Sequence, residues 1–207
     1  MSRSLAILFA LFVLATSLRA DTYSTYKTTR YYSANKQYIL EVTPKRRATL
    51  YHKGRRRNPL WTRTIPILPN QVLVKNDGSR VAIIDNYYGN GSNPNEPVVI
   101  FLNDRGIELA RYQLGMLANL SRVVTTTSDA EWYREARLTS DESTLVIESV
   151  VAARDPAKCA HVETPEEADE CSRSVPYEQF TFATATGKLT SRIPLTIAVS
   201  GMASNEQ

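Results

Sequence analysis

The chain is poor in the residues that catalytic sites most often use. Its 207 residues include only two histidines, His52 and His161, and two cysteines. Nucleophilic hydrolysis needs a serine or cysteine activated by a base, usually histidine, and no G-x-S-x-G segment accompanies either histidine. Glycine-rich fingerprints that open a helix in phosphate-binding and dinucleotide-binding folds are also absent. We therefore predict no catalytic residue and no cofactor, and expect a non-enzymatic protein.

Carboxylates offer a remaining route to hydrolysis. Two carboxylates held about 5 to 9.5 Å apart can hydrolyse glycosides. The candidates are Asp85, Asp104, Glu108 and Glu148. Spacing along the sequence does not show whether they converge in a β-fold. A degenerate or carboxylate-dependent hydrolase is therefore kept as an alternative function.

The one long apolar run lies at the N-terminus. Arg3 precedes the apolar segment from Leu5 to Ala15, and the small residues Thr16, Ser17 and Ala20 follow, interrupted by Leu18 and Arg19. This layout is typical of a secretory signal peptide, and about 11 apolar residues are too few to cross a bilayer about 30 Å thick. We predict cleavage after Ala20, with cleavage after Ser17 or an uncleaved anchor as alternatives. The mature protein is expected to be secreted or periplasmic, with no membrane span.

The mature chain is long enough for one domain. We assign residues 1–20 to the signal peptide, 21–199 to a single β-repeat domain and 200–207 to a flexible tail. A chain of this size buries about 70% of its unfolded surface in one core.

Both cysteines, Cys159 and Cys171, lie in the mature chain. An exported protein with two cysteines most simply pairs them. The disulfide would close an acidic loop and stabilise the fold by about 3 kcal/mol. A metal site made of Cys159, His161 and Cys171 is the alternative, but it has only three candidate ligands. We therefore predict a disulfide and no metal.

Strand signals recur three times along the chain. A polar turn precedes an apolar strand in SANK-QYILEV, KNDG-SRVAIID and SDES-TLVIESV, and a strand-turn-strand segment follows each copy. Asp-Gly between apolar runs, as at Asp77-Gly78, favours a hairpin because glycine tolerates a positive φ. A helix of one or two turns is expected only near Met116 to Leu120. Trp132 and Tyr133 are expected at the edge of a sheet or core.

Several segments resemble blades of bacterial β-propeller repeat proteins. The resemblance rests on SRVAIID, PVVIFLN and YEQFTFATATGKL and covers about Tyr32 to Thr196. It implies four antiparallel strands per blade and a scaffold for binding. Closed propellers need about four to eight blades, so three units leave two sheet faces exposed. We predict an all-β protein whose blades form an incomplete arc. The alternatives are a β-sandwich and a homodimer that completes a propeller.

Charge is divided unevenly between the two parts of the chain. Residues 1–75 contain 14 Lys and Arg against two acidic residues, whereas the remainder contains 11 against 19. The cations are densest at Lys45, Arg46, Arg47, Lys53, Arg55, Arg56, Arg57 and Arg63. Such a cluster can concentrate polyanions, although export argues against nucleic acid. The alternative is that these residues form a solvated hairpin that pairs with the acidic later part of the molecule.

The segment from Asp85 to Glu96, DNYYGNGSNPNE, is the most unusual in composition. Its oxygens could bind Ca²⁺, but it lacks the EF-hand spacing, so a connecting loop is the preferred interpretation. Exposed loop aromatics often take part in recognition. The predicted binding residues are Asp85, Asn86, Tyr87, Tyr88 and Asn90 in this loop, with Lys53, Arg55, Arg56 and Arg57 in the basic hairpin. We expect a binding module for an anionic envelope component or a protein partner.

Overall fold

The structure is a computed structural model and describes residues 27–85, 93–125, 130–152, 164 and 173–195. These residues form three four-stranded antiparallel sheets and a two-stranded ladder. The all-β prediction is confirmed, and the sheets form an unclosed arc of propeller-like blades. The predicted signal peptide, the tail and both cysteines lie outside the described residues.

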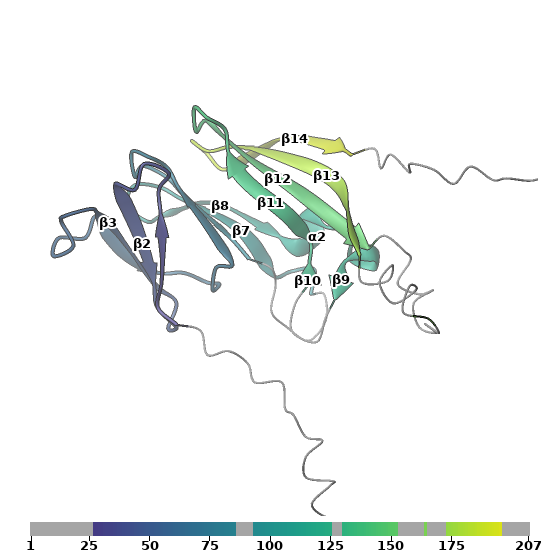
Figure 1. Ribbon diagram of the computed structural model, residues 1–207, viewed down its shortest axis with the longest axis horizontal. Helices are drawn as coiled ribbons and strands as arrows, with labels where there is room; N and C mark the ends of the chain where they lie inside the picture. Colours follow the sequence, from purple (N-terminus) through teal and green to yellow (C-terminus); the bar gives the residue numbers. More distant parts are fainter. Residues whose placement is uncertain (1–26, 86–92, 126–129, 153–163, 165–172, 196–207) are drawn as a thin grey trace, which may run out of the picture.

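Each sheet is a meander whose strands pair in the order of the sequence. Sheet 1 contains β1 (Thr29–Tyr32), β2 (Tyr38–Val42), β3 (Arg47–His52) and β4 (Trp61–Thr64). Sheet 2 contains β5 (Gln71–Val74), β6 (Val81–Ile84), β7 (Pro97–Leu102) and β8 (Glu108–Gln113). Sheet 3 contains β11 (Tyr133–Leu138), β12 (Thr144–Ala152), β13 (Ser174–Ala183) and β14 (Lys188–Pro194). Figure 1 shows sheet 2 between the other two.

Sheet 2 is buried on both faces because its apolar residues alternate between two cores. Val81 and Ile83 of β6 pack in a cluster with sheet 1, whereas Ala82 and Ile84 pack in a cluster with sheet 3. Side chains along a strand point alternately to opposite faces. A strand covered on both sides therefore reads as an unbroken apolar run, as VAII does. This explains why the strongest strand signals in the sequence come from the middle sheet.

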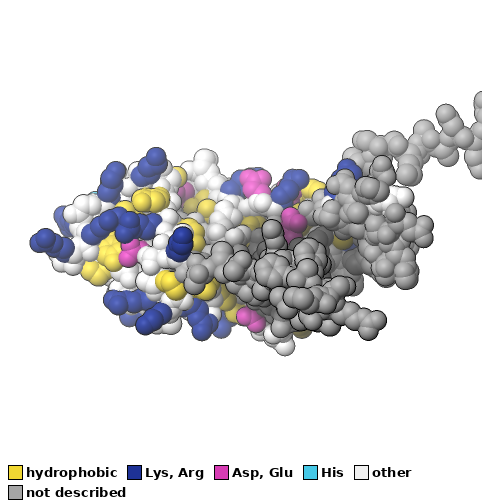
Figure 2. Space-filling view, turned by 60° about the horizontal axis from the view of Figure 1, so that its bottom comes forward, with side chains coloured by type: hydrophobic (Ala, Val, Ile, Leu, Met, Phe, Trp, Pro, Cys, Tyr) yellow, Lys and Arg dark blue, Asp and Glu magenta, His cyan; other side chains and the backbone are white. Residues whose placement is uncertain are grey.

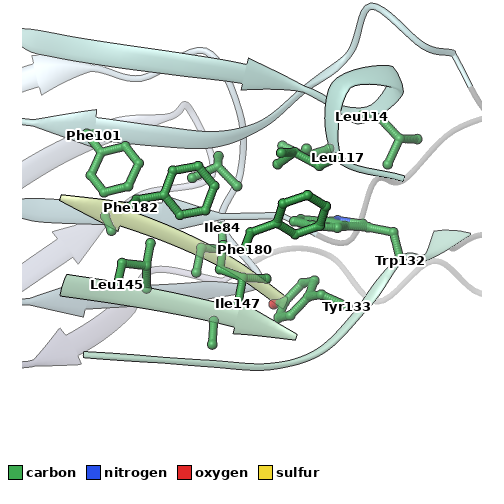
Figure 3. Close-up of a cluster of buried hydrophobic side chains, with 14 of the residues drawn as sticks. Ile84, Phe101, Leu114, Leu117, Trp132, Tyr133, Leu145, Ile147, Phe180 and Phe182 are labelled. Atoms are coloured by element: carbon green, nitrogen blue, oxygen red, sulfur yellow. The ribbon is translucent and has the colours of Figure 1, made fainter. Parts of the chain in front are cut away.

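Each core contains one of the two tryptophans. Trp61 lies in the core between sheets 1 and 2, and Trp132 in the core between sheets 2 and 3. Figure 3 shows the second core, in which Phe101 of sheet 2 meets Phe182 of sheet 3 with ring centroids 5.6 Å apart. Tyr133 is also buried there. Both aromatic residues expected at a core edge therefore belong to the core.

The outward faces of sheets 1 and 3 are polar. On sheet 1, Arg30 pairs with Glu41 across neighbouring strands. On sheet 3, Arg134 forms an ion pair with Glu148. A charged face loses its hydration when another sheet covers it, so these faces suit contact with water. The arc therefore ends in two solvated faces and not in bare apolar ones.

The connection from sheet 2 to sheet 3 is irregular. It contains α2 (Leu114–Leu117), the 3₁₀ turn η1 (Leu120–Arg122), and the ladder of β9 (Val124–Thr125) with β10 (Ala130–Glu131). The short helix agrees with the one or two turns expected from the sequence. None of the helices among the described residues is long and apolar enough to cross a membrane.

Candidate functional site

The meander topology sorts the connections between strands into two ends of the arc. The first and third connections of each sheet lie at one end, which we call the turn end; for sheet 1 these are residues 33–37 and 53–60. The second connection of each sheet lies at the opposite loop end. The described residues at the loop end include 43–46, Asp85, 93–96 and Arg173. A strand of six residues separates the two ends by about 20 Å.

Asp85 and the cations of residues 53–57, both predicted to bind, lie at opposite ends of the arc. Asp85 begins the long loop at the loop end, whereas Lys53 and residues 55–57 lie in the third connection of sheet 1 at the turn end. The remaining loop residues, Asn86, Tyr87, Tyr88 and Asn90, lie outside the described residues. The structure therefore does not bring Asp85 and the cations of 53–57 together.

Asp85 is held inside the protein. Its residue is 7% exposed, and its backbone N–H donates a hydrogen bond to the Val98 carbonyl at 3.0 Å. The Asp85 carbonyl accepts a hydrogen bond of 2.7 Å from the indole Nε1 of Trp132. These bonds fix the start of the loop against the core between sheets 2 and 3. Asp85 acts as an anchor for the loop.

The four candidate carboxylates do not gather in one place, although Asp104 and Glu108 both lie at the turn end of sheet 2. Asp85 lies at the loop end and Asp104 in a turn at the turn end. Glu108 bonds to Arg111 at 2.7 Å on the same strand, and Glu148 pairs on the outward face of sheet 3. In the described part of the chain, no three His, Cys, Asp or Glu side chains gather as metal ligands would.

Positive charge is concentrated on sheet 1 and its connections. Residues 27–64 carry eleven Lys and Arg against a single acidic residue, Glu41. Figure 2 shows Lys and Arg gathered at the left end of the molecule, where Figure 1 places sheet 1. The Glu41 carboxylate accepts a hydrogen bond from Arg30 Nε at 2.7 Å. This hydrogen bond and the negative charge of Glu41 raise the pKa of Arg30. The one carboxylate of the sheet is therefore already neutralised.

The basic segment divides into two groups. Residues 45–47 lie in and beside the turn between β2 and β3 at the loop end, and residues 53–57 lie between β3 and β4 at the turn end. The sequence interpretation treated residues 45–57 as one basic hairpin. The whole length of β3 separates the groups, so that interpretation is corrected to two patches about 20 Å apart.

Among the described residues, no ion pair joins these two patches to the acidic later part of the chain. Beyond sheet 1, the ion pairs between described residues stay within a single sheet or turn. They are Lys75–Asp77, Arg111–Glu108, Arg134–Glu148, Arg137–Glu135 and Arg192–Glu178. Arg46 instead donates to the Pro66 carbonyl at 2.7 Å. The described acidic groups therefore leave the charge of the patches uncompensated.

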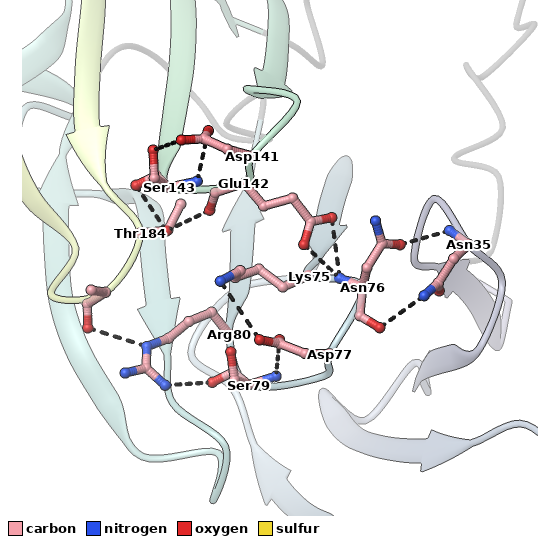
Figure 4. A network of polar contacts seen from close by, with 11 residues as sticks. Asn35, Lys75, Asn76, Asp77, Ser79, Arg80, Asp141, Glu142, Ser143 and Thr184 are labelled. Carbon is pink, nitrogen blue, oxygen red and sulfur yellow. Dashed lines mark hydrogen bonds and ion pairs between the residues drawn. The ribbon is translucent and has the colours of Figure 1, made fainter.

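A polar chain at the turn end joins all three sheets. The Asn35 backbone N–H donates to Asn76 Oδ1 at 2.7 Å, and the Asn35 amide donates to the Asn76 carbonyl at 2.9 Å. The Asn76 N–H in turn donates to the Glu142 carboxylate at 2.9 Å (Figure 4). These residues occupy the three polar turns that mark the repeat in the sequence. The sequence located the turns but did not show that they bind one another.

Asp141, next to this chain, has an unusual acidity. The Thr139 hydroxyl donates to its carboxylate at 2.6 Å, and the side-chain hydroxyl and backbone N–H of Ser143 donate as well. These hydrogen bonds favour the ionised form and lower the pKa of Asp141 to about 2. The same hydrogen bonds stabilise the turn between Thr139 and Ser143, so we interpret Asp141 as a structural carboxylate.

Comparisons with known proteins indicate only a likeness of fold. No family model matches the chain, and no curated protein sequence matches it. A hydrazine synthase of Kuenenia stuttgartiensis is similar over 79% of this chain and 41% of its own, with 16% identity and a TM-score of 0.43. The Cps50 (Swd1) β-propeller domain of Myceliophteria thermophila is similar over 81% and 42%, with 10% identity and a TM-score of 0.38. The periplasmic gluconolactonase PpgL of Pseudomonas aeruginosa is similar over 87% and 57%, with 13% identity and a TM-score of 0.35.

The chain thus spans less than two thirds of the length of each of these structures. Such likenesses assign neither a ligand nor a reaction to this chain.

Proposed function

We propose that the protein is a non-enzymatic binding module of the cell envelope, secreted or periplasmic, that engages an anionic component through sheet 1. The observation that carries the proposal is the eleven Lys and Arg against one acidic residue in residues 27–64. The predicted signal peptide supports an envelope location.

The accessibility of the cations supports the same function. The side chains of residues 45–47 and 53–57 are exposed, and Glu41 is paired with Arg30. Exposed charges of one sign create a potential that attracts an oppositely charged partner and accelerates its association. The attraction weakens as salt shortens the screening length from about 30 Å at 0.01 M to about 8 Å at 0.15 M. Binding through this surface is therefore sensitive to salt.

A pull-down against envelope fractions at low and moderate salt tests this proposal. We expect the protein to bind an anionic fraction at low salt and to lose most of that binding when Arg55→Ser and Arg56→Ser are combined. The matched control combines Arg134→Ser with Arg137→Ser on sheet 3, which changes the net charge equally. If both double variants lost binding equally, the loss would follow from net charge alone, which would contradict a site on sheet 1. Salt-insensitive binding would instead point to the loop at Asp85.

The alternatives receive less support from the described residues. A carboxylate-dependent hydrolase needs two carboxylates in one cleft, and Asp85 and Asp104 lie at opposite ends of the arc. Glu108 lies at the same end as Asp104 but is ion-paired with Arg111. A propeller completed by a second copy would have to cover the ion-paired outward faces of sheets 1 and 3, which carry Arg30–Glu41 and Arg134–Glu148. Removing such pairs from water costs free energy. The loop from Asp85 remains a proposed second surface at the loop end.

A further inference from the structure

The outward face of sheet 1 combines aromatic rings with hydroxyl groups. Cross-strand pairing sets Tyr32 beside Ile39 and Ile39 beside Tyr51, which makes one row on this face. A second row runs from Glu41 through Thr49 to Thr62. The hydroxyls of Thr49 and Thr62 lie 3.3 Å apart. Thr64, farther along β4, pairs with Arg47. Tyr32 is 51% exposed and lies two residues from Arg30 on the same face of β1.

The two basic patches stand at opposite ends of this face. Arg47 begins β3 on the outward face, next to Lys45, and Lys53 follows the last residue of β3. Between them lie about 20 Å of sheet whose carboxylate, Glu41, is paired with Arg30. A compact anion can reach only one patch at a time. An extended chain of negative charges can reach both.

We propose that the occupant of this face is a linear acidic polysaccharide that runs along β3 from one patch to the other. This inference rests on the proposed function, because it names the anionic partner of the same sheet. Arginine and lysine at each end bind the acidic groups. Tyr32 and Tyr51 offer flat amphipathic rings against which sugar rings stack. The half-buried Thr62 and the exposed Thr64 carry hydroxyls that can donate to and accept from sugar hydroxyls, whereas Thr49 is buried beneath them. A linear polyphosphate would use the patches and leave the tyrosines without a role.

Two patches on one ligand make the binding bivalent. Once a chain is long enough to engage both, the second contact becomes intramolecular and raises the affinity by about 100-fold or more. A chain with an extended length under about 20 Å gains nothing from the second patch. The affinity should therefore increase in a step with ligand length, and not in proportion to the number of charges.

The experiment measures the affinity of the full chain for sulfated oligosaccharides of defined length, from well below to well above about 20 Å. We expect a step of about 100-fold between short and long chains. Combining Lys45→Ser with Arg47→Ser should abolish the step, so that long chains bind about as tightly as short ones, through the patch at residues 53–57. Combining Tyr32→Ala with Tyr51→Ala should lower the affinity for the long oligosaccharide and leave the affinity for a polyphosphate of equal length unchanged. Circular dichroism confirms that each variant is folded.

The outcomes separate this inference from the proposed function. An affinity that does not depend on ligand length would overturn the proposal that one ligand bridges both patches. The proposal that sheet 1 binds anions would remain. Equal affinity for polyphosphate, with no effect of the tyrosine variants, would overturn the saccharide. Tighter binding to vesicles of anionic lipid than to the longest oligosaccharide would identify a bilayer as the partner instead. Failure to bind any of these anions, or any envelope fraction, would overturn both proposals.

Discussion

At the scale of single residues, Gly78 shows how closely the first two sheets approach each other. Its φ is +70°, and a Cβ added there would lie 2.3 Å from Cε1 of Tyr38 on the neighbouring sheet. We expect Gly78→Ala to lower the free energy of unfolding by about 2 to 4 kcal/mol, because the backbone strain and the collision with the ring add. Urea denaturation measures the change.

Gly54 provides the matched control. Its φ is +83°, and no atom lies within 4 Å of an added Cβ. Gly54→Ala should therefore carry only the backbone strain of about 1 to 2 kcal/mol. Similar losses at both positions would mean that the Tyr38 ring moves aside at little cost, and that the contact between the sheets is loose.

The sequence predicts where the turns of the repeat lie but not which groups the turn residues hydrogen-bond to. Lys36 and Glu142 adopt positive φ values of 58° and 56° at the positions that correspond to Gly78. The polar letters indicated a turn at each place, and the structure has one. The bonds of Asn76 to its neighbours go partly to backbone groups, which no side-chain pattern reveals.

At the scale of strands, Tyr112 of β8 fastens sheet 2 to sheet 3. Its hydroxyl donates to the Gly187 carbonyl at 2.9 Å and accepts from the Leu189 N–H at 2.8 Å. Its ring also lies against Phe182 with centroids 5.0 Å apart. Tyr112→Phe keeps the ring contact and leaves two partly buried backbone groups without a partner.

We therefore expect Tyr112→Phe to lower the free energy of unfolding by about 1 to 3 kcal/mol. Chemical denaturation followed by far-ultraviolet circular dichroism measures the loss. Tyr177→Phe on β13 is the control, since the Tyr177 hydroxyl forms no hydrogen bond with the described residues. A loss at Tyr112 no larger than that at Tyr177 would show that water replaces the lost bonds and that the hydroxyl does not fasten the sheets.

The predictability of strands follows their burial. β6 and β7 are covered on both faces and stand out in the sequence as apolar runs. β1, Thr29–Tyr32, alternates between half-buried and exposed residues at the end of the arc, and the sequence analysis did not assign it as a strand. β9 and β10 are two residues each, too short for any periodicity to show. Strand signals thus weaken where tertiary contact is on one side only.

At the scale of the whole molecule, the number of sheets could be predicted from the sequence. The division of the basic residues into two separate patches could not. Three repeats gave three sheets because each unit is a local meander. The relation of residues 45–47 to residues 53–57 depends on how long β3 runs between its turns. Neighbours in sequence consequently lie at opposite ends of the sheet, and the candidate surface had to be divided.

The middle sheet also determines how the molecule should unfold. Sheet 2 supplies one wall to each core, so loss of either core exposes an apolar face of the same sheet. Repeat arrays stay cooperative only when such nearest-neighbour contacts outweigh the stability of single units. The short meanders have little core of their own. We therefore expect the three sheets to unfold as one unit.

The two tryptophans test this expectation, because each reports on a different core. Trp61→Phe leaves the fluorescence of Trp132 as a probe of the core between sheets 2 and 3, and Trp132→Phe leaves Trp61 as a probe of the other. In each variant, fluorescence and far-ultraviolet circular dichroism should give the same urea midpoint, since two-state unfolding makes all probes coincide. The comparison within one variant cancels the stability lost by the substitution itself. A fluorescence midpoint that separates from the circular dichroism midpoint in either variant would show that one core opens while the other persists, with sheet 2 retaining only one covered face.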